Sequence, residues 1–127
     1  MEDFPVFTLE EANYKIPDVI RVTEEAITRL EEIKEPYERL GFRKFNPIHN
    51  LTDDDLVKVE WARQIAALGI YPKGYFIVDF QSPDADTFYC WKYGETDVSH
   101  EHKKWETFVD RRRIQSNGQG TDRTLGG

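Results

Sequence analysis

The sequence predicts an α+β fold in which two long antiparallel helices pack with a small antiparallel β-sheet of two to three strands and a short C-terminal helix or arm. Three observations support this prediction. Apolar residues recur at heptad spacing from Ala12 to Leu40, as in a long amphipathic helix. A wider apolar stripe runs from Leu56 to Leu68. Aromatic and β-branched residues then fill 75–80 and 88–93, as in two paired strands.

The first helix begins at a capping box, in which the side chains of Thr8 and Glu11 can each bond the backbone amide of the other residue. Pro17 has no amide proton, so it predicts a kink or restart near Ile16. Pro36 predicts that the helix ends or bends just before it. The apolar line of this helix, here called the heptad seam, consists of Ala12, Ile16, Val19, Thr23, Ala26, Leu30, Ile33, Tyr37 and Leu40, of which only Thr23 is polar.

The second helix has Thr52 as its expected N-cap, and Asp53, Asp54 and Asp55 occupy its first turn, where the helix dipole stabilises carboxylates. We interpret the three aspartates in this way rather than as a metal site, because consecutive helical residues point in different directions. Gly69 predicts a left-handed residue that ends the helix. The helix should be more than half buried through Leu56, Val57, Val59, Trp61, Ala62, Ile65, Ala66 and Leu68.

A polar turn separates the two predicted strands, and a second turn at 94–97 allows 98–102 to return as a third strand. Apolar residues at helical spacing within 103–113 predict a short helix or an ordered arm. Residues 115–127 are polar and glycine-rich, which predicts a disordered tail. Residues 1–114 therefore form one expected domain.

Charge and composition narrow the functional classes. The 127 residues carry a formal net charge of −7, which argues against general nucleic-acid binding. The single cysteine, Cys90, cannot form an internal disulfide. No apolar run approaches the roughly 18 to 20 residues of a membrane-spanning helix, and acidic Glu2 and Asp3 follow Met1 where a secretory leader would be basic and apolar. We therefore expect a cytoplasmic protein that does not associate with a membrane.

Four groups of residues follow one another along the chain: Phe-Thr-Leu-Glu-Glu-Ala-Asn at 7–13 with Pro17, Leu-Gly-Ile at 68–70, Gly74 with Val-Asp-Phe at 78–80, and Cys-Trp-Lys-Tyr-Gly-Glu at 90–95. In this order they resemble domain-of-unknown-function family 2203, and the resemblance is collinear over most of residues 7–113. It implies a small α+β domain made of a long helical pair and an antiparallel sheet. It implies no established activity.

The chain departs from the family pattern after the hairpin. His102, Phe108 and Arg112 fall at or near positions where the family resemblance implies the same residue types. Glu101 stands where the pattern has tryptophan, and Thr107 and Asp110 replace two glycines. Without these glycines, a tight binding loop built from backbone groups is not expected here.

The candidate site depends on how the second and third strands pair. If the turn is centred on 94–97, Trp91 lies opposite His100 and Tyr89 lies opposite His102. Because side chains alternate between the two faces of a sheet, both histidines then share one face with both rings, and Cys90 and Glu101 lie on the opposite face.

Histidines at positions i and i+2 of a strand are neighbours on one face and can bind one metal ion. His100 and His102 are therefore the candidate metal ligands, and zinc is an example of the divalent transition metal they would hold. A third ligand is needed, and Asp79 or His49 would supply it if the fold brings either residue close. The alternative is that the histidines only pack against the aromatic rings of the sheet or face solvent.

A small-molecule ligand would bind the same face, with Tyr89 and Trp91 as aromatic walls and Arg112 closing over the edge. Cys90 is expected to be a buried, inert thiol, because a nucleophilic cysteine needs a lowered pKa and a base within reach.

No nucleophile–base pair, phosphate-binding loop or CxxC cluster occurs in the sequence, so no catalytic residue is assigned and an enzyme is not favoured. The favoured function is a noncatalytic interaction or self-assembly module that forms a homodimer through the heptad seam and has a possible protein partner. The alternative is a metal-binding protein or small metalloenzyme using His100 and His102. A weaker alternative is an RNA- or nucleotide-associated module. That module would use the basic residues of the C-terminal arm, which are Lys103, Lys104, Arg111, Arg112 and Arg113. We favour a different explanation for these residues, in which they dock on the acidic first helix of the same or another copy.

Overall fold

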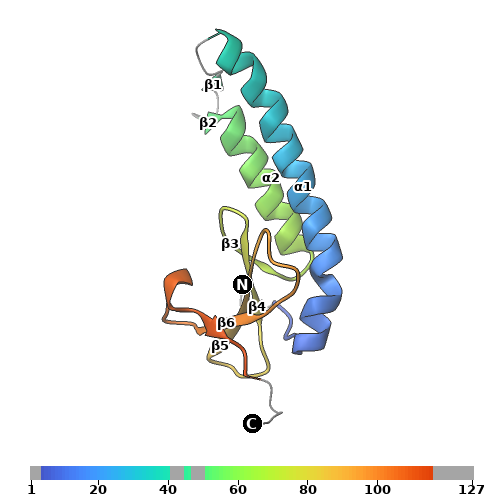
Figure 1. The fold of residues 1–127 in the computed structure, drawn as a ribbon, viewed down its shortest axis with the longest axis vertical. Coiled ribbons are helices and arrows are strands. Elements are labelled where there is room, and N and C mark those ends of the chain that lie inside the picture. Colours follow the sequence, from blue (N-terminus) through green and yellow to red (C-terminus); the bar gives the residue numbers. More distant parts are fainter. Residues whose placement is uncertain (1–3, 41–44, 47–50, 116–127) are drawn as a thin grey trace.

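The computed structural model describes residues 4–40, 45–46 and 51–115, with side chains described for 4–33 and 53–115. Within these ranges a pair of helices extends away from an antiparallel sheet (Figure 1). His49 and residues 116–127 of the predicted tail lie outside the described residues. The α+β class is confirmed.

Helix α1 spans Leu9–Leu40 and is 32 residues long. Its capping box is present, because the Thr8 amide donates to Glu11 Oε1 at 2.9 Å and the Glu11 amide donates to Thr8 Oγ1 at 3.1 Å. The helix runs on through Pro17 and Pro36, so a restart near Ile16 and an end near Pro36 are wrong, while the alternatives of a kink near Ile16 and a bend before Pro36 stay predictions. A proline inside a helix costs roughly 3 kcal/mol, and burial of Ile16 and Val19 on either side of Pro17 offsets that cost.

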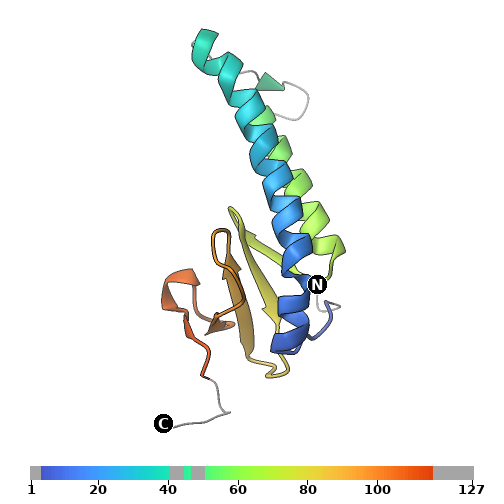
Figure 2. The same cartoon turned by 45° about the vertical axis from the view of Figure 1, so that its right-hand side comes forward.

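Helix α2 spans Asp53–Ala67, and its 15 residues make it about half as long as α1, so only one of the two helices is long. The two helices lie side by side and run in opposite directions (Figures 1 and 2). Val57, Trp61 and Ile65 form the buried line of α2, whereas Val59 is 57 % exposed, so the predicted stripe is buried along one line only.

The heptad seam of α1 packs inside the chain. Ala12, Ile16, Val19, Thr23 and Ala26 are buried, in one core with α2 and the sheet. The indole Nε1 of Trp61 donates to Thr23 Oγ1 at 2.9 Å, so the one polar residue of the seam has a buried partner on α2. The seam is therefore explained by intramolecular packing over this part of its length.

The main sheet has five strands instead of the two to three expected, in the order β3-β4-β5-β6-β7 with all neighbours antiparallel. The sequence did not suggest β3 because it contains Pro72 and Gly74, nor β7 because it has only two residues. A separate two-stranded ladder, β1 (Phe45–Asn46) with β2 (Leu51–Thr52), lies between the helices in sequence. The strands of the main sheet are β3 (Tyr71–Gly74), β4 (Ile77–Gln81), β5 (Thr87–Lys92), β6 (His100–Lys103) and β7 (Arg112–Arg113).

Strand alternation gives the sheet two different faces. The inner face carries Val78, Phe80 and Trp91, which are completely buried in the core shared with the helices. The outer face carries Asp79, Cys90 and His102, which are also completely buried although they lie away from that core. Two completely buried ionisable side chains, Asp79 and His102, beside a buried thiol on one sheet face are unusual enough to mark the candidate site.

The chain after β6 forms the predicted arm, which contains a single 3-10 turn at Phe108–Asp110 before β7. This arm holds Trp105 and Val109 in solvent, with 71 % and 85 % of their surface exposed. In the described part of the chain, no helix combines the length and the apolar character needed to cross a membrane.

Candidate metal centre

The pairing of β5 with β6 differs by one residue from the expected register. Cys90 lies opposite His100, and Phe88 lies opposite His102. Because side chains alternate with a period of two, this shift exchanges the faces: Cys90 joins the histidines, and Tyr89 and Trp91 turn to the other side. The predicted common face of the two rings and the two histidines is therefore wrong.

The connection between the strands explains the shift. Glu95 forms a tight turn, in which its amide donates to the Lys92 carbonyl and its carboxylate accepts from the Lys92 amide, both at 3.0 Å. The Val98 amide donates to Asn13 Oδ1 at 2.7 Å and the Val98 side chain is buried, so α1 draws this residue out of the third strand. The third strand starts at His100 as a result, rather than at Val98.

The three predicted ligand-binding residues do not join the histidines. Tyr89 packs partly buried against the core, and Trp91 is completely buried with its Nε1 donating to the Glu95 carbonyl at 3.0 Å. Arg112 donates to both carboxylate oxygens of Glu106 at 2.8 Å. The preceding residue, Arg111, does reach the cluster face, where its Nη1 lies 3.9 Å from Cys90 Sγ.

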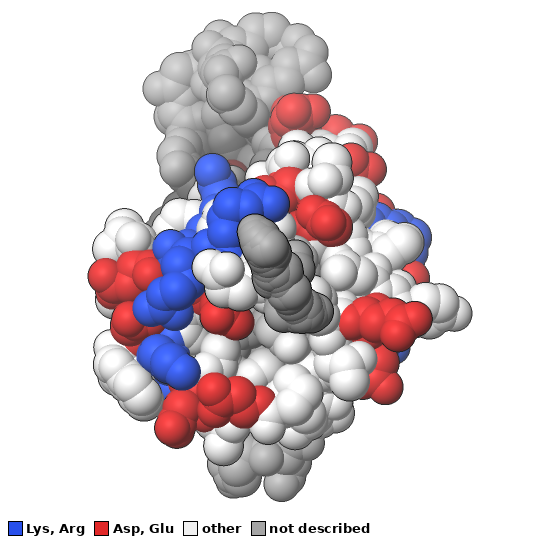
Figure 3. Space-filling model, turned by 60° about the horizontal axis from the view of Figure 1, so that its bottom comes forward, with Lys and Arg blue, Asp and Glu red and all other residues white. Residues whose placement is uncertain are grey.

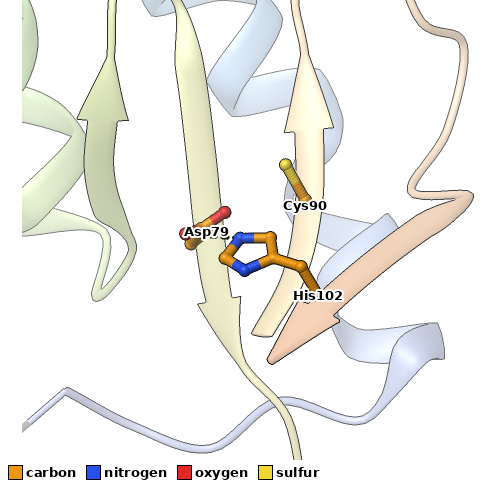
Figure 4. Close-up of side chains that lie close together, drawn as sticks. All are labelled: Asp79, Cys90 and His102. Atoms are coloured by element: carbon orange, nitrogen blue, oxygen red, sulfur yellow. Dashed lines mark hydrogen bonds and ion pairs between the residues drawn. The ribbon is translucent and has the colours of Figure 1, made fainter. Parts of the chain in front are cut away.

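Asp79, Cys90 and His102 converge instead, one from each of the neighbouring strands β4, β5 and β6 (Figure 4). A carboxylate oxygen, the thiol sulfur and a ring nitrogen all lie within 4.8 Å of one another. The close-up shows the three side chains on the side of the sheet opposite α1. We call this group the Asp-Cys-His cluster.

The hydrogen bonds of His102 define its proton arrangement. Its Nδ1 lies 2.8 Å from the Lys103 carbonyl, which can only accept, so Nδ1 carries a proton. Its Nε2 lies 3.0 Å from Asp79 Oδ2, and this contact also needs a proton. Either His102 is an imidazolium or Asp79 is protonated, so the pair shares one proton that a metal ion could replace.

Asp79 is poorly satisfied for a buried acid. Its Oδ1 has no hydrogen-bond partner among the described residues. Burial raises the pKa of the carboxyl group, and the positive field of His102 opposes that rise. The Nζ atom of Lys73 lies 4.0 Å from Asp79 Oδ2, so the lysine forms a long ion pair with the carboxylate. A buried oxygen without a hydrogen-bond partner needs a physical explanation, and a bound cation is one.

Cys90 is a neutral thiol in this environment. Burial raises the pKa of Cys90 to about 12, the charge of Asp79 adds to the rise, and Arg111 opposes it. An Nη1 atom of Arg111 lies 3.9 Å from the sulfur, and the same guanidinium is ion-paired with Glu95. Such a thiol is a poor nucleophile, although metal coordination would deprotonate it.

His100 lies beside the cluster but is not part of it. It shares the outer face with His102, as strand spacing predicted, and its Nδ1 bonds the Ser99 hydroxyl at 2.9 Å. Burial lowers the pKa of His100, and the charge of Arg111 lowers it further. Of the two predicted metal-binding histidines, only His102 meets other ligand types.

The basic arm docks on the sheet, not on α1, within the described part of the chain. Arg111 bonds Glu95 and Arg112 bonds Glu106, while Lys103 Nζ lies 3.5 Å from Asp84 Oδ2. The predicted docking on the acidic first helix of the same chain is therefore not seen.

Comparison with known proteins places the chain in a family without adding an activity. The sequence matches DUF2203, described as an uncharacterised conserved protein, over residues 5–114. No curated protein and no solved structure matches it.

Proposed function

The chain belongs to the DUF2203 family, whose description assigns no activity, so from the side chains themselves we propose that it is a metal-binding protein. Asp79, Cys90 and His102 would hold one divalent transition metal ion, with zinc as the first candidate. The observation that carries this proposal is the convergence of three different ligand types at a buried point where Asp79 Oδ1 has no partner.

The ligand types and distances suit such an ion. Zinc binds carboxylate oxygen, imidazole nitrogen and thiolate sulfur at about 2.0 to 2.3 Å, so tetrahedral ligand atoms lie about 3.2 to 3.8 Å apart. The three ligand atoms are within 4.8 Å of one another, and His102 Nε2 is already 3.0 Å from Asp79 Oδ2. Small rotations of buried side chains would complete the geometry.

The outer hydrogen bonds of His102 also fit a ligand. Metal-binding histidines commonly donate their second ring N–H to a carbonyl or carboxylate, which holds the ring in place. The Nδ1–H group of His102 donates in this way to the Lys103 carbonyl at 2.8 Å. Nε2 would then offer its lone pair to the metal, which would take the place of the proton shared with Asp79.

A direct test is to measure the metal content of untagged protein after purification and after zinc reconstitution. The expected result is one zinc per chain in the wild type, with His102→Gln and Cys90→Ser each losing most of it. His100→Gln is the matched control, because it changes the same residue type on the same face outside the cluster. Zinc content at background in the wild type, or equal loss in both histidine variants, contradicts the proposal.

A second candidate is the self-assembly module, with a homodimer as its form. It is supported by a groove of about 850 Å³ along α1 and α2, whose floor includes Ile20 and the buried Val22, Ala26, Val57 and Trp61 and whose edges are charged, with Arg21, Glu25 and Arg29 among them. Leu30 and Ile33 of the heptad seam are partly buried, as is Ile27 beside the seam. A second copy could cover these residues without disturbing the sheet.

The nucleotide-associated alternative has less support. Three of the five basic residues on which it relied, Lys103, Arg111 and Arg112, already pair with carboxylates of the same chain. Phosphate binding along the whole arm would have to displace those partners.

A further inference from the structure

Basic side chains surround the Asp-Cys-His cluster on the outer face. Strand alternation places Lys92 on this face with Cys90, and Arg113 on it with His100. Lys104 Nζ lies 5.4 Å from the centre of the Phe88 ring, which is on the same face. Figure 3 shows Lys and Arg side chains gathered in a band at the end of the molecule that carries the sheet.

Two further basic side chains, those of Lys73 and Arg111, contact the cluster itself. Lys73 Nζ is 4.0 Å from Asp79 Oδ2, and Arg111 Nη1 is 3.9 Å from Cys90 Sγ. The Lys73 side chain is 40 % exposed, whereas that of Arg111 is 13 % exposed. Because Asp79, Cys90 and His102 are themselves completely buried, an incoming molecule would reach the cluster by displacing the more exposed of these two cations, Lys73.

Charge balance around a bound metal leaves a net positive site. The carboxylate of Asp79 and the thiolate of Cys90 would balance the two charges of the ion. Glu95 already balances Arg111 through their ion pair. Among the described residues, the ion-pair contact of Lys73 is with Asp79, so the positive charge of Lys73 is then left without a second anion there to balance it. Three protein ligands also leave one position of a tetrahedral ion open.

We propose that this open position binds a phosphate group, with Lys73 and Arg111 donating to its oxygens. The proposal rests on the metal-binding function proposed above and adds the class of ligand that the site would take. A guanidinium has five N–H donors, so Arg111 can bond Glu95 and still donate to a phosphate. Lys73 would act as a point charge on the solvent side.

The test uses the whole protein loaded with cobalt(II), whose absorption bands report both the thiolate bond and the coordination number. Inorganic phosphate is titrated at constant ionic strength, and its ³¹P signal is recorded in parallel. The expected result is a saturable change in the visible bands together with paramagnetic broadening of the ³¹P signal, which places phosphate next to the ion. Acetate at the same concentrations should produce a much smaller change.

Lys73→Gln and Arg111→Gln should each weaken phosphate binding about tenfold, as expected from the loss of one charge-assisted hydrogen bond. Both variants should retain the thiolate-to-cobalt band. Arg112→Gln removes the same charge at a residue bonded to Glu106, and it should bind phosphate like the wild type. Because the Lys73 side chain is 40 % exposed and that of Arg111 is less so, the Lys73 variant remains informative even if Arg111→Gln does not fold.

The outcomes separate the two proposals. A protein without the thiolate-to-cobalt band contradicts the metal site itself. A normal band that phosphate does not change, or that acetate changes equally, leaves the metal site standing and overturns the phosphate proposal. Equal weakening in Arg112→Gln would also overturn it, because the effect would then be one of general surface charge.

Discussion

Asp79 is the residue on which the candidate site depends most. It lies between Val78 and Phe80, whose side chains fill the core, and its own side chain is equally buried on the opposite face. Its carboxyl group has one ring nitrogen at hydrogen-bond distance and one oxygen without a partner among the described residues. A buried acid in this state lowers stability unless it is protonated or bound to a cation.

The pH dependence of the free energy of unfolding should reveal the destabilising effect of ionised Asp79. Burial raises the pKa of Asp79 against the opposing effect of His102, so the folded protein holds the proton more tightly than the unfolded chain. The resulting stabilisation is complete below the unfolded pKa of about 4 and is lost as pH rises through the raised folded pKa. In chelator, the wild type should therefore lose stability relative to Asp79→Asn as pH rises, measured by urea unfolding.

Asp84→Asn provides a control of opposite sign. A hydrogen bond from the Asp86 amide, and another from Thr87, lower the pKa of exposed Asp84, so its contribution is present above the unfolded pKa and is lost as pH falls. If the wild type instead gains stability over Asp79→Asn as pH rises, Asp79 is not a buried acid with a raised pKa.

Gly69 is a second residue with a defined physical role. Its φ is +85°, and a Cβ atom there would lie 2.8 Å from Pro5 Cγ. Gly69→Ala should therefore cost about 1 to 2 kcal/mol from the left-handed backbone, plus the displacement of Pro5, in urea unfolding. Gly74→Ala is the control, since its nearest contact would be 3.9 Å away. Equal stability of the two variants would contradict this account.

At the scale of elements, a buried hydrogen bond joins α1 and α2 within the apolar core between them. Trp61 is 4 % exposed and Thr23 is completely buried, and the indole N–H donates to the threonine hydroxyl at 2.9 Å. This bond fixes which turn of α1 lies beside Trp61, since an unpaired buried donor is penalised.

Thr23→Val keeps the shape of the side chain but removes the acceptor. It should lower the free energy of unfolding by about 1 to 3 kcal/mol, because the indole N–H is left buried without a partner. Thr23→Ser keeps the hydroxyl and should be the milder change of the two. Urea unfolding of both variants tests the order, and a Thr23→Val protein as stable as the wild type would show that the bond contributes nothing.

At the scale of the whole molecule, a metal ion would join three strands of the sheet at one point. A ligand that binds only the folded protein stabilises it by about 2.7 kcal/mol at 100 times its Kd. Zinc at that excess should raise the urea midpoint of the wild type and leave that of Cys90→Ser unchanged. A zinc response that persists in Cys90→Ser would place the binding elsewhere on the molecule.

The association state is the other property of the whole molecule to be tested. If the groove along the helices holds a second copy, light scattering should give twice the chain mass of 15.0 kDa. Ile20→Glu should then return the protein to the monomer mass, because it places a charge in the groove. Val109→Glu is the control, as Val109 is 85 % exposed in the arm. A measured mass of one chain at every concentration would contradict the homodimer.

Local patterns in the sequence were sufficient to place two helices, although not to place the end of the first. The capping box at Thr8 and the left-handed Gly69 each depend on neighbours a few residues away, and both are present. Of the apolar positions predicted along the first helix, Ala12, Ile16, Val19 and Ala26 are buried. The two central strands were also predictable, because aromatic and β-branched residues gather there. Strand β3 was missed because Pro72 and Gly74 are not typical of strands, and the helix continued through Pro17 because core packing outweighed the local penalty.

The sequence by itself thus determined that two helices and a central hairpin exist, and it named His102 as one of two candidate histidines. Only the tertiary structure decided the partners of His102, since pairing of β5 with β6 depends on distant contacts such as that of Asn13 with Val98. A register shift of one residue exchanged Trp91 for Cys90 on the outer face. Side chains alternate every residue along a strand, so the chemistry of a sheet face depends on its exact register, which local sequence patterns specify only weakly.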